Sequence, residues 1–553
     1  MDEFKETTID DKDKPRLEMS SKRRWVVTIG VMTGMFIAAL EATVVGTAMP
    51  TVIAALGGLN RYSWVFSAYL ITSTVTVPVW GKLSDLYGRR LFYQIGIGIF
   101  LLGSVLSGLS GSMTQLIVFR AIQGLGAGAL VPLAMTIIGD IFTLKERAKM
   151  QAYFSGVWGL SSVIGPIVGG FITDQLSWRW VFYINLPIGL AAALIIGIAL
   201  KEPKHTERPA IDYAGAGLLM ASITLMMLAL VEGGTTFETF FAPNNLIFLG
   251  GAIILALLFV IIERRAVDPI IPFALFRNRT VSVSVGAGFL AGVAMFGAIS
   301  FVPLFAQGAL GSTATEAGSL LTPLMLSWVT LSVIGGRLLL KLGYRSISIA
   351  GFILLTIGFI FLALVGRETA RIWLYADLIL IGSGLGLTML TLLIAVQQAV
   401  NKTQLGVATS LNQFSRSIGG AFGVAVMGAV LSAGLVTNLN AAVEKNILSP
   451  TQAEAFAANP NALIDPQAQA ALPAGSLDVL RDAMAMSIHK VFWVGAILSA
   501  LSLFVILFLP RSGEENAESI TAEDLPSPKC GERMVMAEFT RLDSESEPSA
   551  AAK

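Results

Sequence analysis

The sequence predicts an all-α membrane protein, and three observations lead to this fold class. Apolar residues make up 54% of the 553 residues and charged residues only 14%, against about 25% charged residues in ordinary globular domains. The apolar residues gather in fourteen long stretches, and about 20 apolar residues are enough for a helix to span a bilayer. Positive charges concentrate in every second connection between these stretches.

The predicted helices follow one another along most of the chain. Each is a stretch of apolar residues bounded by charged or turn-forming residues. They run at about residues 25–49, 62–81, 91–110, 114–141, 148–172, 178–200, 211–231, 246–263, 280–306, 315–340, 346–366, 371–397, 404–432 and 488–510.

Lysine and arginine residues gather in alternate connections. They precede the first span and follow the second, fourth, sixth, eighth and tenth, whereas the other connections carry far fewer. Since positively charged connections stay on the cytoplasmic side, the pattern places both termini in the cytoplasm. It predicts a multi-pass protein of the cytoplasmic (inner) membrane with an even number of helices.

The two ends of the chain repeat each other. Residues 81–90, GKLSDLYGRR, recur as residues 336–345, GRLLLKLGYR, at a shift of 255, and the spaced glycines at 124–128 recur at 382–386, at a shift of 258. Such repeats are typical of transporters built from duplicated halves. The predicted organisation is a polar cytoplasmic N-terminus (1–24), an N-terminal six-helix bundle (25–200), two inserted helices (211–263), a C-terminal six-helix bundle (280–510) with an external loop (433–487), and a disordered cytoplasmic tail (511–553).

The composition excludes several classes of function. The formal net charge of +1 gives no strong positive field for nucleic acid. One cysteine, Cys530, allows no internal disulfide, and the only histidines, His205 and His489, have no ligand-like spacing. The sequence has neither a phosphate-binding loop of the Gly-x-x-x-x-Gly-Lys type nor a Gly-x-Ser-x-Gly elbow. We therefore expect no enzyme, no metal site and no cofactor.

Glu41 and Arg120 are the first candidate site residues. Glu41 lies nine residues before Pro50, about 13 Å from the outer end of its span, and Arg120 lies about 9 Å from the same face. Charged residues within membrane spans are functional candidates by default, and a buried guanidinium needs a partner. The two residues either couple protons to substrate or form a fixed ion pair, and Gln123, one turn from Arg120, is placed to share their network.

Two further candidates lie in the C-terminal half. Asp377, near the outer end of the twelfth span, is either a second acid that attracts cations or an interfacial residue that reaches water. Arg416 lies near the middle of the thirteenth span with Asn412 and Gln413 within one turn. This cluster is expected to pair across helices and to line a central cavity, where Asn412 and Arg416 are candidates for substrate contact.

The fifth span contains an unusual run of glycines. Residues 156–170 read GVWGLSSVIGPIVGG, although each glycine costs a soluble helix about 1 kcal/mol relative to alanine. In a membrane, small residues let helices approach closely. The Gly165-Pro166 pair therefore marks either a hinge or a close-packing seam.

These motifs, in this order, resemble the fourteen-helix drug:proton antiporters of the major facilitator superfamily, the QacA/EmrB type. The resemblance covers nearly all of residues 25–510. Besides residues 81–90 and the Gly165-Pro166 segment, it rests on LEATVVGTAMP at 40–50, RAIQG at 120–124, WRWVFYINLPIG at 178–189 and ERRAVDPIIP at 263–272. It implies the major facilitator fold, with two six-helix bundles plus two inserted helices.

The resemblance also implies functions for particular residues. Arg120 would serve proton transfer together with Glu41. The family usually has aspartate at the position that Glu41 occupies here. Asp85, Arg89 and Arg90 would form a cytoplasmic gate.

The implied activity is export of lipophilic, often cationic, drugs by a monomer, driven by a proton gradient without a cofactor. The implied partners are a small-molecule lipophilic substrate, protons and the lipid bilayer, with no nucleic acid. An exporter of a lipid or endogenous metabolite on the same fold remains the alternative.

Overall fold

The computed structural model describes residues 17, 19–56, 62–202, 212–232, 241–266, 269–312, 314–445, 447–458 and 476–510. Regular structure in this part of the chain is helical throughout, and twelve of its helices are long and apolar enough to cross a membrane. The expectation of a helical protein that crosses a membrane many times is thereby confirmed. Most of the predicted polar N-terminus and the whole predicted tail lie outside the described residues.

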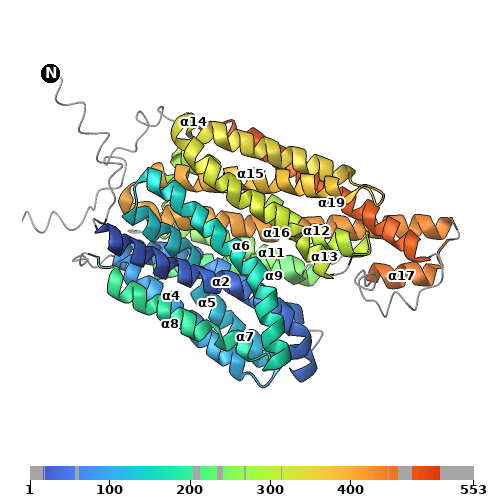
Figure 1. The fold of residues 1–553 in the computed structure, drawn as a ribbon, viewed down its shortest axis with the longest axis horizontal. Helices are drawn as coiled ribbons and strands as arrows, with labels where there is room; N and C mark the ends of the chain where they lie inside the picture. The colour runs from blue at the N-terminus through green and yellow to red at the C-terminus, as the bar shows by residue number, and fades with distance from the viewer. Residues whose placement is uncertain are drawn as a thin grey trace, which may run out of the picture.

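The N-terminal half forms one side of the body (Figure 1). Its sixth predicted span is divided into two helices, and the second begins at Asn185. Pro187, in the first turn of that helix, suits a helix start because proline lacks a backbone N–H. The helices of this half are α2 (Ser21–Leu56), α3 (Tyr62–Tyr87), α4 (Arg89–Leu109), α5 (Met113–Ile141), α6 (Leu144–Gln175), α7 (Trp180–Tyr183) and α8 (Asn185–Ala199).

The C-terminal half forms the other side of the body (Figure 1). It contains α12 (Arg279–Gly308), α13 (Ala314–Ser319), α14 (Leu321–Leu364), α15 (Arg371–Gln398), α16 (Leu405–Glu444), α17 (Pro450–Ala458) and α19 (Ser476–Ile506), with short 3-10 turns at Phe273–Arg277 and Lys402–Gln404.

The connections at Gly88 and Gly343 show that the two halves share a tight turn. Gly88, just before α4, has φ 102°, and Gly343, inside α14, has φ 72°. Glycine alone adopts positive φ without a steric penalty. Both glycines occupy the same place in the repeat, since 343 − 88 = 255. α14 therefore contains the tenth and eleventh predicted spans on either side of Gly343.

Close helix packing in the N-terminal half depends on the glycines of α5. A Cβ atom added at Gly124 would lie 2.1 Å from Thr72 Oγ1 in α3, and one at Gly126 would lie 2.3 Å from the Phe100 backbone nitrogen in α4. Both distances are too short for any side chain. α5 is thus held between α3 and α4 at backbone contact distance.

The glycines of α15 serve the same purpose in the C-terminal half. A Cβ atom added at Gly382 would lie 2.1 Å from the Leu324 carbonyl oxygen, and one at Gly384 would lie 2.7 Å from the Leu355 nitrogen. These contacts are with the two parts of α14 on either side of its turn. The repeated glycines therefore make equivalent contacts in both halves.

The segment predicted as an external loop at 433–487 is in part helical. α16 continues to Glu444, α17 follows, and α19 begins at Ser476. Leu435, Leu439 and Ala442 are buried at helical spacing, so the extension packs one apolar face. Hydropathy predicts the apolar part of a helix that crosses the membrane, and it does not detect where the helix ends. The end of α16 and α17 project from one end of the body (Figure 1).

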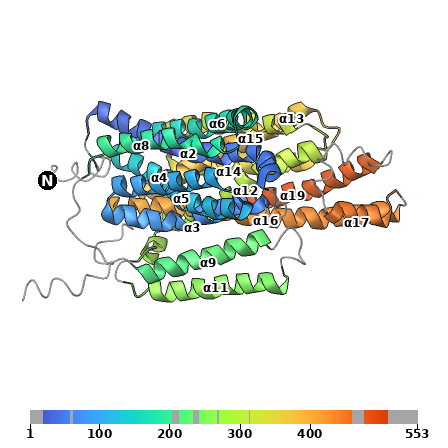
Figure 2. The same cartoon turned by 90° about the horizontal axis from the view of Figure 1, so that it is seen from below.

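The two inserted helices, α9 (Tyr213–Glu232) and α11 (Pro243–Glu263), lie side by side against one face of the body (Figure 2). α9 is the inner helix, in contact with α3 and α16, and α11 packs on α9.

Candidate functional site

A buried ion pair lies inside the N-terminal half. Glu41 of α2 and Arg120 of α5 are each about 1% exposed, and Arg120 Nη1 donates a hydrogen bond to Glu41 Oε1. The structure thus brings together the two charges that helix geometry places at similar depth. Removing one partner of such a pair leaves an uncompensated buried charge, at a cost of about 3–5 kcal/mol.

Three more polar side chains complete a network around this pair. Asn185, the first residue of α8, donates from Nδ2 to Glu41 Oε2 at 2.6 Å and to Ser104 Oγ at 2.9 Å. Gln123 accepts from Arg120 at 2.7 Å and donates to Ser104 at 3.2 Å. Both carboxylate oxygens of Glu41 are therefore bonded, and four helices, α2, α4, α5 and α8, meet at the network.

Arg120 also connects this network to α3. Its Nε donates to the Val65 carbonyl oxygen at 3.3 Å, and its guanidinium lies 4.2 Å from the centre of the Tyr69 ring. A cation over an aromatic face contributes about 0.5–2 kcal/mol. A change in the charge of Glu41 would consequently reach α3 through the Arg120 side chain.

The hydroxyl of Thr43 does not hold Glu41. It donates instead to the Leu40 and Ser161 carbonyl oxygens, at 2.9 and 3.2 Å. A Cβ atom added at Gly165 of α6 would lie 1.9 Å from Thr43 Oγ1, so Gly165 is a close-packing position between α2 and α6. The side chain of Pro166 lies outside the described residues.

A second cluster of charges joins the two halves at one end of the body. The Asp85 carboxylate of α3 accepts from the Gly406 and Val407 backbone nitrogens at 3.0 and 2.7 Å. These are among the first N–H groups of α16, where the helix dipole favours a negative charge. A side chain of the N-terminal half thus caps a helix of the C-terminal half.

Arg89 holds Asp85 in this position. Its Nη2 pairs with the Asp85 carboxylate, and its Nε donates to Asp140 Oδ2 at 3.0 Å. Asp140, near the end of α5, is therefore part of this charge cluster. The backbone nitrogens of Arg89 and Arg90 donate to the two Glu202 carboxylate oxygens at 2.9 Å each, whereas Arg90 itself is exposed.

Asp377 of α15 is buried, so the expectation that it reaches water past Arg371 was wrong. Within the described part of the chain, its Oδ2 atom has no hydrogen-bond partner. The other interpretation, a second acid inside the C-terminal half, stays a prediction.

Arg416 of α16 interacts with neutral groups. Its guanidinium bonds the Gln413 side chain and lies 3.3 Å from Met389 Sδ. No carboxylate of the described residues forms an ion pair with it. The buried Nδ2 of Asn412, one turn away, has no partner within the same residues. The predicted cluster therefore exists, with donors that remain available for an acceptor.

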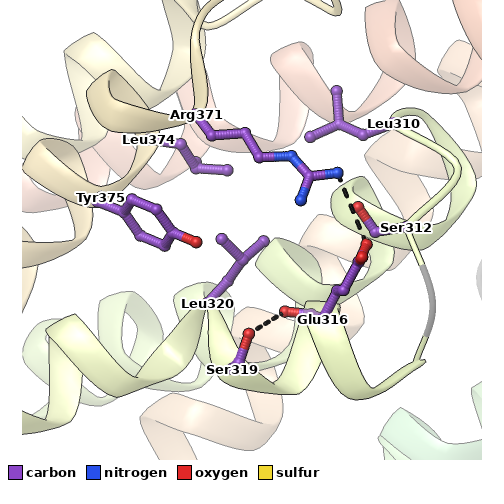
Figure 3. Close-up of a pocket in the computed structure, with 8 residues that line it drawn as sticks. All are labelled: Leu310, Ser312, Glu316, Ser319, Leu320, Arg371, Leu374 and Tyr375. Atoms are coloured by element: carbon purple, nitrogen blue, oxygen red, sulfur yellow. Dashed lines mark hydrogen bonds and ion pairs between the residues drawn. The ribbon is translucent and has the colours of Figure 1, made fainter.

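A pocket of about 100 Å³ lies between α13 and α15 (Figure 3). Arg371 Nη2 and Glu316 Oε2 face each other across it at 3.6 Å, with Tyr375 and Leu320 at its side. Both charged side chains are about half exposed. An exposed ion pair of this kind contributes about 0–1 kcal/mol to stability. It is therefore too weak to hold the pocket closed.

The duplicated halves, the sealed acid–base network and the helix cap between the halves define this protein as a polytopic membrane transporter. Residues 31–424 match the family model of the Major Facilitator Superfamily. The chain belongs to this superfamily, and it is a transporter rather than an enzyme.

Multidrug transporters are among its relatives. The chain is 40% identical to the "Multidrug transporter protein MdtP" of Bacillus subtilis (strain 168), over 88% of this chain and 93% of that protein. It is 37% identical to "Multidrug resistance protein 3" of the same organism, over 90% and 97% of the two chains.

Solved structures share the fold. The human organic anion transporter MFSD10 superposes with a TM-score of 0.56 at 16% identity, over 88% of this chain and 100% of that one. The proton:xylose symporter XylE gives 0.55 at 13% identity, over 89% and 97%.

Sequence reasoning missed Asn185, Ser104 and Glu202. Asn185 lies within the WRWVFYINLPIG motif, and a buried amide in an apolar span was the one available signal. Ser104 and Glu202 have no distinguishing pattern around them, since a serine in a membrane span and a glutamate at a helix end are both ordinary.

Proposed function

We propose that this transporter is a proton-coupled antiporter of the fourteen-helix QacA/EmrB type that exports lipophilic, cationic compounds across the cytoplasmic membrane. The Glu41–Arg120 network carries the proposal. A fully buried carboxylate is the group whose charge can change when a proton arrives. The multidrug names of two relatives support the substrate class.

The proposed cycle follows from the contacts of Glu41. Protonation from the outside turns its carboxylate into a neutral acid and removes the negative charge that Arg120 faces. Arg120 retains Gln123 and the Val65 carbonyl as acceptors, so the ion pair between α2 and α5 weakens without stranding the guanidinium. A cation that binds from the inside then favours the carboxylate and drives the proton off.

The proposed membrane topology includes α3 and α6 as spans, which gives fourteen helices and places both termini in the cytoplasm. α3 runs alongside α5, one of the twelve candidate spans. Val65 contacts Arg120, and the Trp80 ring nitrogen donates to the Leu125 carbonyl oxygen at 2.8 Å. α6 packs along α2 in the same way through Gly165.

The Asp85 cap would serve as the cytoplasmic gate. While Asp85 bonds the start of α16, the two halves are held together at that end. Arg89 positions the carboxylate, and Arg90, which faces outward, would contribute charge at the membrane surface. The bend proposed at Gly165-Pro166 would let α6 change shape when the two halves move apart at the gate.

Other residues have narrower proposed roles. Asp377 would be a second proton acceptor in the C-terminal half. Gln123, Asn412 and Arg416 would contact substrate together with Glu41. The protein is proposed to act as a monomer, with no cofactor besides the proton gradient.

One observation favours the alternative function. Arg416 has no carboxylate partner among the described residues, and an unpaired guanidinium attracts carboxylate or phosphate groups. An exported lipid or endogenous metabolite with an anionic group would suit it. The natural substrate would then combine an apolar body with a negative charge.

Dye efflux from proteoliposomes tests the proposal. Purified protein is reconstituted with a fluorescent rhodamine cation, and a pH gradient is imposed in either direction. Proton-driven dye movement that stops when an ionophore collapses the gradient supports antiport. Movement that is insensitive to the gradient, or no faster than in protein-free liposomes, would overturn it. An anionic lipid analogue moved in place of the dye would favour the alternative.

A further inference from the structure

The inserted helices cover one of the two seams between the halves. α3 and α16 come from different halves and meet along this seam. α9 packs on both, and its Ile223 and Met227 form one buried cluster with Ile71 and Val75 of α3 and Leu411 of α16. Each of these side chains is at most 6% exposed. α9 therefore closes the line along which α3 and α16 would separate.

α11 adds a second layer over the same seam. It packs on α9, and its outward face carries exposed apolar side chains, among them Ile247, Ile254 and Leu257. Figure 2 shows the pair stacked on one face, with α11 outermost. A molecule dissolved in the bilayer meets α11 on this side, with two helices between it and the seam.

The α3–α16 seam is also tightly packed beneath this cover. A Cβ atom added at Gly81 of α3 would lie 2.3 Å from Ser410 Oγ, and one at Gly406 of α16 would lie 2.5 Å from Asp85 Oδ1. These two contacts hold α3 and α16 together at the end of the seam beside Asp85.

The inserted helices do not cover the seam between α6 and α14. α6 lies on the far side of the body from α9 and α11 (Figure 2). The two helices touch at Gly159, where an added Cβ atom would lie at an ordinary 3.9 Å from Val329 Cγ2. At Gly156 and Gly170, no atom of the described residues lies within 4 Å of such a Cβ. Leu326, one turn from Val329 on α14, is exposed.

We infer that lipophilic substrates enter this transporter from the bilayer between α6 and α14, because the inserted pair closes the seam between α3 and α16. The inference rests on the proposed export of bilayer-soluble compounds. It gives α9 and α11 a function in directing substrate entry.

Bulky adducts attached after folding test the route. Cys530, the single cysteine, is replaced by serine, and Gly156→Cys or Leu326→Cys is introduced beside the α6–α14 seam. Ile254→Cys, on the exposed face of α11, is the matched control. Each purified variant in nanodiscs is compared before and after reaction with a bulky maleimide, so that folding is the same in both measurements. The association rate and the equilibrium affinity of the rhodamine cation are then measured.

A blocked route and a damaged binding site give different results. The adduct at Gly156→Cys or Leu326→Cys is expected to slow association several-fold and leave the equilibrium affinity unchanged. A blocked route slows dissociation by the same factor as association, so the ratio of the two rates stays the same. The adduct at Ile254→Cys is expected to change neither. Unchanged rates at both seam positions, lost affinity there, or slower association with the Ile254→Cys adduct would overturn the inference. No dye binding to any unlabelled protein would instead overturn the proposed function.

Discussion

Asn185 Nδ2 lies 2.6 Å from Glu41 Oε2, so the first residue of α8 holds the carboxylate oxygen that Arg120 leaves free. The same Nδ2 bonds Ser104 of α4. Glu41 is consequently fixed from two sides, by a cation of α5 and by an amide of α8. A change in its protonation would loosen both contacts at once.

Asn185→Ala is expected to weaken this network. A hydrogen bond to a charged group contributes about 1.5–3 kcal/mol, and the substitution leaves Glu41 Oε2 without a donor. We expect a lower melting temperature in detergent and a loss of dye efflux of about tenfold. Asn244→Ala, at the exposed start of α11, is the control and should change neither quantity. Full efflux by Asn185→Ala would show that the amide contact is dispensable.

Alanine at the interhelical glycines is expected to destabilise both halves. Gly126→Ala would place a methyl group 2.3 Å from the Phe100 nitrogen, and Gly384→Ala would place one 2.6 Å from the Gly351 carbonyl oxygen. Overpacking of this kind costs about 1–3 kcal/mol.

The matched control for these variants is Gly98→Ala in α4, where no atom of the described chain lies within 4 Å of the added methyl group. Its melting temperature in detergent should equal that of the wild type or exceed it, because alanine favours a helix. Equal melting temperatures for all three variants would contradict the packing described here.

The Asp85 cap is expected to control access from the gate end. Asp85→Asn loses the charge that the start of α16 favours, so the gate should open more often. Ser410→Cys, buried next to Gly81, reports the opening by its reaction with maleimide in the Cys530→Ser background. We expect a several-fold faster reaction in Asp85→Asn and no change in Arg90→Gln. Equal rates in the two variants would argue against a gate at Asp85.

Arg416 is expected to influence which charge the substrate carries. Arg416→Gln removes a positive charge that opposes cations, so rhodamine binding should tighten by about 1–2 kcal/mol, roughly five- to thirtyfold. Binding of an anionic dye should weaken by a similar factor. Equilibrium fluorescence titration measures both, with Arg371→Gln at the exposed pocket as control. Unchanged affinities for both dyes would remove Arg416 from the proposed substrate site.

Counting residues along a span was enough to predict that Glu41 and Arg120 share a depth, because helix rise is constant. Repetition within the chain was enough to predict equivalent glycines in the two halves. In both cases a regular geometry connects sequence position to place in the structure.

Other features depend on contacts that have no local signal. Asn185 meets Glu41 across 144 residues, and Asp140 meets Arg89 across 51, so neither pairing follows from neighbouring residues. The break before Asn185 and the extension of α16 to Glu444 were missed for a different reason. Hydropathy detects apolar length, whereas helix ends depend on capping and on packing outside the membrane.

The central claim is that Glu41 carries the exchanged proton, and drug-induced proton release tests it most directly. A lipophilic cation such as tetraphenylphosphonium is added to purified protein in weakly buffered detergent, with wild type beside Glu41→Gln. The amide keeps an acceptor for Arg120 but cannot ionise. The two proteins are compared at cation concentrations where they bind the same amount of cation. We predict that the wild type releases protons and that Glu41→Gln releases none. Undiminished release by Glu41→Gln would contradict the claim and direct attention to Asp377.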